Sequence, residues 1–159
     1  MTTARVLSVL GISLPLALAL LTGCERPTTI HNAATDVTGQ WAVTTDNVNG
    51  EGMDCNTSGL VVQLTQNADG TFTGNALGGT LICDYMGTET AQDVTGLSVT
   101  GSVNVPARTI NIDVPVDSAT LNGVVNQSNT FMTGTTQLVI GVGGGGNVTV
   151  QGPWNATKQ

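Results

Sequence analysis

Few residues in this chain have side chains that could perform covalent or acid–base chemistry. Cys24, Cys55 and Cys83 supply its only thiols, and His31 is its only histidine. A thiol can act as a nucleophile, a metal ligand or a disulfide partner, and structural zinc normally takes four cysteine or histidine ligands. Two cysteines with one distant histidine make a poor zinc set. A Ser-His-Asp triad would need a histidine inside the folded domain. His31 lies in the segment 24–36, which is predicted to be a tether, and this position disfavours such a triad.

The eleven acidic residues are scattered, and no pair of carboxylates stands out for a two-carboxylate hydrolase. Segment 46–54 is acidic and could offer carboxylates and carbonyls to Ca²⁺. Val48 stands where the EF-hand template places an oxygen ligand, so a polar, glycine-rich loop is the favoured alternative. The sequence therefore predicts a protein that is not an enzyme and that holds no metal or cofactor.

The N-terminal segment has the layout of an export signal. Arg5 carries the single positive charge of a short n-region, and the apolar stretch 6–20 that follows is uncharged. This stretch is short for a membrane-spanning helix, which needs about 20 residues, and Pro15 interrupts it. Residues 1–23 are therefore predicted to form a signal peptide with a helical core.

The sequence Leu21-Thr22-Gly23-Cys24 follows the apolar stretch and resembles the cleavage motif of bacterial lipoproteins at all four positions. The resemblance implies that Cys24 becomes the first mature residue and carries a thioether-linked diacylglycerol with an amide-linked chain such as palmitate. Each buried CH₂ contributes about 0.8 kcal/mol, so two or three chains would hold the protein on a membrane. A plain secretory signal with an incidental cysteine is the alternative.

Glu25 occupies the position after the lipid-bearing cysteine. In enterobacterial lipoproteins an aspartate there is typical of inner-membrane retention, so the resemblance implies the bacterial cell envelope, and the outer membrane in particular, facing the periplasm or the cell surface. Residues 24–36 have no apolar periodicity and are predicted to be a flexible tether. The folded domain is then expected at 37–159.

Assigning Cys24 to the lipid leaves Cys55 and Cys83 as an even pair in an exported, oxidising compartment. A disulfide between them is the favoured interpretation, and metal binding is the alternative. It would close a loop of about 27 residues and stabilise the domain by about 3–4 kcal/mol on the chain-entropy model.

The formal net charge of −7 disfavours nucleic acid as a partner, since four basic residues cannot neutralise many phosphates. It equally disfavours electrostatic docking on anionic lipid. The expected membrane attachment is therefore through acyl chains alone.

From Val37 onward, apolar and polar residues alternate with period two, which is typical of strands with one buried face. Short turn-like segments separate the strands, so neighbours in sequence are expected to pair antiparallel. The pattern predicts an all-β fold, an up-and-down barrel of eight or nine strands, because closure removes exposed edges. A β-sandwich is the alternative. The expected strands are 38–45, 59–66, 71–77, 80–85, 96–105, 109–114, 119–126, 131–140 and 147–157.

Glycines recur in the inward register of different strands. They either leave a cavity for a ligand or make room for large aromatic side chains such as Trp41 and Trp154, and the second reading is favoured. The set is Gly74, Gly101, Gly123, Gly134 and Gly152.

The first and last strands carry Gly39-Gln40-Trp41 and Gly152-Pro153-Trp154-Asn155-Ala156-Thr157-Lys158. The first resembles the Gly-x-Trp opening of the lipocalin and avidin-type (calycin) barrels. The second is similar to an ending seen in many small bacterial lipoproteins. The resemblance implies a barrel plug in which Lys158 covers Trp41.

Two functions remain open at this stage. One is a lipid-anchored, non-enzymatic barrel that binds a small apolar or amphiphilic ligand. The other is a lipoprotein with a filled barrel that acts through its surface on a protein partner, as in envelope assembly or protease inhibition.

Overall fold

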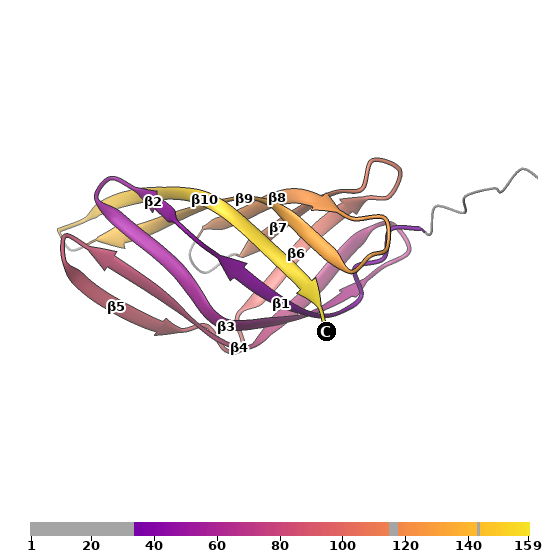
Figure 1. The fold of residues 1–159 in the computed structure, drawn as a ribbon, viewed down its shortest axis with the longest axis horizontal. Helices are drawn as coiled ribbons and strands as arrows, with labels where there is room; N and C mark the ends of the chain where they lie inside the picture. Colours follow the sequence, from indigo (N-terminus) through magenta and orange to yellow (C-terminus); the bar gives the residue numbers. More distant parts are fainter. Residues whose placement is uncertain (1–33, 115–117, 143) are drawn as a thin grey trace, which may run out of the picture. The chain divides into compact units, whose positions relative to one another are not determined.

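A computed structural model describes residues 34–114, 118–142 and 144–159, and Figure 1 shows their fold. The predicted signal peptide, Cys24, His31 and most of the predicted tether lie outside these residues. The described part contains no helix, and so none long and apolar enough to cross a membrane. Its strands are β1 (Gly39–Thr45), β2 (Val48–Gly50), β3 (Met53–Gln66), β4 (Thr71–Tyr85), β5 (Thr88–Asp93), β6 (Ser98–Asn104), β7 (Thr109–Val114), β8 (Ala119–Val125), β9 (Phe131–Val142) and β10 (Gly146–Lys158).

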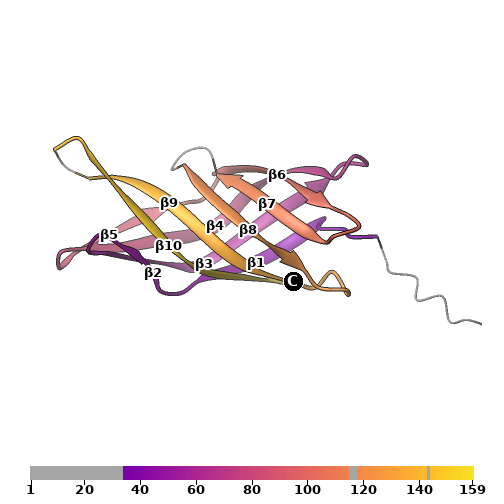
Figure 2. The same cartoon turned by 90° about the horizontal axis from the view of Figure 1, so that it is seen from above.

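Eight strand positions close into one antiparallel barrel, which confirms the predicted fold class. The order around the wall is β1, β3, β4, β6, β7, β8, β9 and β10, and pairing of β10 with β1 completes the circle. The β-sandwich alternative is wrong, because one continuous ladder of hydrogen-bonded strands returns to its start. Figure 2 shows the strands inclined to the long direction of the barrel, as closure requires.

β2 continues the line of β1, because both lie between β3 and β10. A short break at Asp46 and Asn47 separates the two strands. The turn after β2 consists of Glu51 and Gly52, whose φ angles of 52° and 80° are those of a type I′ hairpin turn. Segment 46–54, which the sequence analysis expected to be a loop, is therefore mostly a narrow hairpin. The prediction was wrong because such turns and irregular polar loops have the same composition.

β4 is one continuous strand, whereas the sequence predicted separate strands at 71–77 and 80–85. The glycine pair at 78 and 79 bends the strand instead of ending it. Gly79 has a φ of 133°, and a Cβ atom there would lie 2.6 Å from the Cα atom of Leu60 on β3. The register between β3 and β4 shifts at this point, so the paired strands bend together.

The sequence analysis did not predict β5, and this strand breaks the expected pairing of sequence neighbours. β4 is long enough to pair with two partners: residues 80–85 pair with β5, and residues 71–75 pair with β6. β5 and β6 therefore occupy the same side of β4 at different heights. The chain between them does not join paired strands.

The two ends of the barrel differ. At one end, which we call the flared end, the sheet order is β5-β4-β3-β2-β10-β9, and β7 and β8 do not extend that far. The hairpins at the left of Figure 1 belong to this end. We call the opposite end, where residues 34–38 lie, the plug end. A first apolar cluster, including Trp41, Phe72 and Trp154, lies inside the barrel, and a second, including Met53 and Val150, lies at the flared end.

Candidate functional site

An apolar cavity of about 130 Å³ lies inside the barrel. Trp41, Trp154 and Met132 line it, and each of these side chains is about 1% exposed to solvent. Aliphatic side chains from β3, β6, β7 and β8 complete its wall. An apolar cavity of about 150 Å³ in another protein stays dry and holds benzene, so the space suits a ligand of that size.

Three threonine hydroxyls are the main polar groups in the cavity wall. The backbone N–H and the hydroxyl of Thr45 both donate to Thr57 Oγ1, at 3.1 and 3.3 Å, and Thr136 Oγ1 donates to the Thr120 carbonyl at 3.2 Å. The threonine hydroxyls are thus bonded to neighbouring strands, and the cavity wall is almost wholly apolar.

Among the described residues that line this cavity there is no aspartate, glutamate, histidine, lysine or arginine. A charged ligand would lose its hydration there without gaining a partner, at a cost of several kcal/mol. The described part of the lining offers an almost wholly apolar surface.

The plug end is closed by residues 34–38, which cross the barrel opening. Val37 and Thr35 are buried, although the sequence analysis placed Thr35 in the tether. The Gln66 side chain fixes the segment: Val37 N donates to Gln66 Oε1 at 2.9 Å, and Gln66 Nε2 donates to the Thr35 carbonyl at 3.1 Å. Hydrogen bonds from the backbone and hydroxyl of Thr38 hold the pKa of Asp36 below its usual value.

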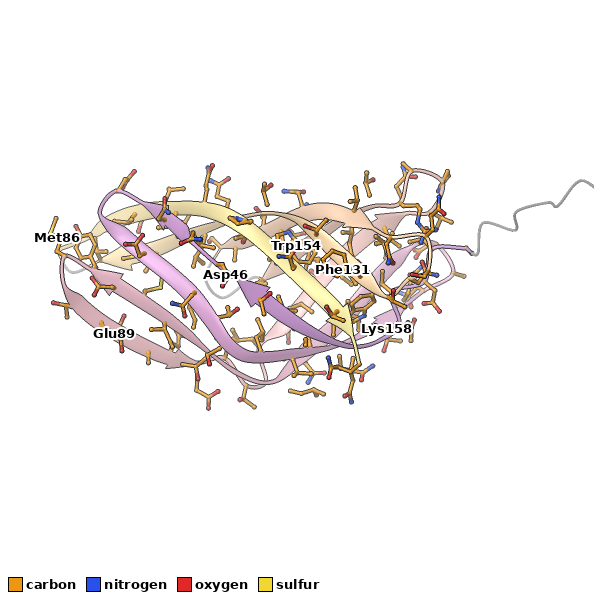
Figure 3. All side chains as sticks on the ribbon, viewed as in Figure 1. Asp46, Met86, Glu89, Phe131, Trp154 and Lys158 are labelled. Atoms are coloured by element: carbon orange, nitrogen blue, oxygen red, sulfur yellow. A yellow bond between two sulfur atoms is a disulfide. The ribbon has the colours of Figure 1, made fainter. Side chains whose placement is uncertain are left out.

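Trp41 and Lys158 meet at this end. Trp41 Nε1 donates to the Val37 carbonyl at 2.8 Å, and Lys158 Nζ lies 5.5 Å from the centroid of the Trp41 ring, within the range of a cation–π contact. The lysine stem also packs over Gly39, where a Cβ atom would lie 2.8 Å from Lys158 Cε. Figure 3 shows Lys158 near the C-terminus of β10.

Arg108 is a second cation at the plug end, and the sequence analysis did not single it out. Its Nε donates to the Val125 carbonyl at 3.0 Å, and its terminal nitrogen contacts the Asn126 carbonyl and Asn129 Oδ1. Asn129 in turn donates to the Ala34 carbonyl at 3.0 Å. The sequence did contain an indication that Arg108 has a structural role, because basic residues are rare in this chain.

The inward glycines do not line the cavity, which corrects that interpretation. A Cβ atom on Gly101 would lie 2.3 Å from the Phe72 ring, and one on Gly123 would lie 2.9 Å from the Trp154 ring. At all five glycines a backbone carbonyl oxygen of a neighbouring segment would also lie within 2.6 Å of the added atom. The glycines are therefore positions of close packing, and Trp154 is one of the aromatic side chains for which the favoured interpretation expected them to make room.

Cys55 and Cys83 form a disulfide between directly paired positions of β3 and β4. Cys55 lines the barrel cavity, whereas Cys83 lines a separate groove at the flared end. The disulfide thus lies between the two spaces. Within the described residues, no three histidine, cysteine, aspartate or glutamate side chains gather as a metal site would require.

No family model matches the chain, and no curated protein matches it. The class of protein is therefore defined by the structure itself: a closed, eight-stranded antiparallel β-barrel with an apolar internal cavity, extended at one end by two further strands.

Proposed function

We propose that this chain is a lipid-anchored lipoprotein of the bacterial envelope whose barrel binds a small, uncharged, apolar or weakly amphiphilic ligand without transforming it. The observation that carries the binding role is the apolar cavity of about 130 Å³. The calycin-like Gly-x-Trp opening and the Lys158–Trp41 contact support a barrel of the ligand-binding type.

The size and polarity of the cavity narrow the ligand class. A typical drug-sized molecule needs a pocket of about 300 Å³ or more, so the cavity favours a benzene-sized molecule or one end of a hydrocarbon chain. The proposal of a non-catalytic role is supported by the described lining residues, none of which is ionisable in the folded protein.

Toluene is a suitable probe, because Trp41 and Trp154 line the cavity and are the only tryptophans in the chain. At about ten times its Kd, toluene is expected to stabilise the protein by about 1.4 kcal/mol and to change tryptophan emission. Ala76→Leu places a larger side chain in the cavity wall and should abolish both responses. Thermal unfolding followed by tryptophan fluorescence measures them.

Ala42→Leu is the matched control, because Ala42 lies between the inward residues Trp41 and Val43 and so faces outward. This variant adds the same volume outside the barrel and should respond to toluene as the wild type does. A wild-type protein that does not respond, or equal responses in the two variants, would contradict the binding role.

The anchor is proposed from the sequence Leu21-Thr22-Gly23-Cys24. Cys24→Ser is expected to move the protein from the detergent phase to the aqueous phase in Triton X-114 partitioning. The diacylglyceryl group and the amide-linked acyl chain should be absent from its intact mass. The double variant Cys55→Ala/Cys83→Ala is the control and should keep the lipid. An unmodified Cys24 in the wild-type protein would rule the anchor out.

A further inference from the structure

The flared end contains a groove of about 470 Å³ that is separate from the barrel cavity. β5 and the end of β9 form its two sides. Leu81 and Tyr85 from β4 and Ile140 from β9 form its apolar wall, and Met86 at the tip is 77% exposed. Figure 3 shows Met86 and Glu89 at this end. Among the described strands, β7 ends at Val114 and β8 begins at Ala119, and neither strand borders the groove.

β5 has a free edge, since its only paired neighbour among the described strands is β4. The direction of its backbone groups follows from the Cys55–Cys83 pair. The Cα atoms of these residues are 4.1 Å apart, which marks a non-hydrogen-bonded pair, so the backbone groups of Cys83 point to Thr90 on β5. The N–H and C=O groups of Glu89 and Ala91 then point away from β4, toward the side of β5 on which no described strand pairs.

The outer face of the flared end is acidic. Asp54, Asp84 and Glu89 stand directly opposite one another on β3, β4 and β5, although like charges in such a row destabilise a sheet. Asp93 follows on the same face of β5, and hydrogen bonds from the Thr95 hydroxyl and backbone lower its pKa. The described basic residues, Arg108 and Lys158, lie at the plug end.

We propose that the flared end binds an extended, basic polypeptide segment, which adds to the free edge of β5 as a further strand. Side chains alternate along such a strand. Those opposite Glu89 and Asp93 lie on the acidic outer face and are lysine or arginine. Those opposite Thr90 and Gln92 enter the groove and are apolar. The recognised pattern is therefore a cation, an apolar residue, any residue, an apolar residue and a cation.

Charge argues against a second copy of this chain as the partner. An antiparallel pair of β5 strands centred on Ala91 would place Glu89 of one copy opposite Asp93 of the other. In this register two such repulsive pairs would accompany the pairing of the two strands. A basic segment turns the same two positions into opposite-charge pairs.

The test uses the full-length protein in mild detergent and the fluorescently labelled peptide TKVTVKT, followed by anisotropy. The wild-type protein is expected to bind this peptide at least about tenfold more tightly than TEVTVET, with affinity falling as salt rises. Hydrogen exchange at the Glu89 and Ala91 amides should slow on binding. The Thr90 amide already pairs with β4 and should change little.

Ala91→Pro removes an outward-pointing N–H without removing a bond to β4, and proline is tolerated at such edge positions. It should weaken TKVTVKT binding at least about tenfold, while Ala91→Ser keeps it. Should the proline variant fail to fold, the double variant Glu89→Lys/Asp93→Lys replaces it. That variant should reverse the preference and favour TEVTVET.

Three outcomes would overturn the proposal. One is the absence of TKVTVKT binding to the wild-type protein. Another is unchanged exchange at Glu89 and Ala91 in the bound state. The third is a dimer of the protein alone that Ala91→Pro dissociates, which would show that a second copy occupies the edge.

Discussion

Gly134→Ala is expected to lower the free energy of unfolding by about 3 kcal/mol, at the upper end of the usual cost of overpacking. A Cβ atom at this position on β9 would lie 1.9 Å from the Asn122 carbonyl oxygen and 2.6 Å from the Cα atom of Gly123. Both atoms belong to the backbone of β8. The methyl group can therefore be accommodated only if two paired strands of the barrel wall move apart.

Gly141→Ala is the matched control on the same strand. The nearest atom to a Cβ there is Asn147 Oδ1, at 3.9 Å, so the methyl group meets only an ordinary contact. Alanine also restricts the unfolded chain more than glycine does, and the variant should be as stable as the wild type or slightly more stable. Chemical unfolding followed by tryptophan fluorescence compares the two. Similar stabilities for both variants would mean that the strands at Gly134 are not as close as described.

Removal of the disulfide by Cys55→Ala/Cys83→Ala is expected to cost about 3–4 kcal/mol, because the cross-link closes a long loop in the unfolded chain. Alanine is preferred to serine since both positions are buried, and a hydroxyl there would add an unpaired polar group. The loss should be greatest at the flared end, where the bond joins β3 to β4 outside the closed part of the wall.

Guanidinium unfolding with and without a reducing agent measures this contribution. Reduction should bring the wild-type protein close to the stability of the double variant and leave the variant itself unchanged. Hydrogen exchange should report earlier opening of β2 and β5 than of β7. If reduction leaves the midpoint of the wild-type transition unchanged, the cross-link contributes nothing to stability.

The predicted strands agree with the structure where alternation is regular. The segments 109–114, 119–126 and 131–140 match β7, β8 and β9 closely, because one face of each strand packs on the barrel interior. Alternation of apolar and polar residues can be recognised within one segment of sequence, because burial of one face of a strand requires an apolar residue at every second position. The pairing of Cys55 with Cys83 could also be predicted from the sequence. It depended on the number of cysteines and on the compartment implied by the lipoprotein-like motif.

The sequence-based predictions were wrong where the same residue types occur in two kinds of structure. The sequence analysis placed a turn at Gly78 and Gly79, yet these residues lie within one long strand and bend it. Residues 88–93, in β5, are exposed throughout and so show no apolar alternation to detect. β6 can pair with β4 because β4 is long. The two glycines led to the prediction of two short strands in its place. Each case needed knowledge of a partner strand that is distant in sequence or not adjacent in the wall.

For the candidate site, the sequence alone determined the closed β architecture, the apolar inward face of the strands and the low content of ionisable residues, because these follow from composition and period. Only the tertiary structure decided that the glycines are contacts and not cavity walls, and that a small cavity remains beside Trp41 and Trp154. The reason is that a cavity is a difference between the space enclosed by eight strands and the summed volume of side chains from all of them. No local pattern encodes that difference, and the same holds for the free edge of β5, which exists because β7 and β8 end before reaching it.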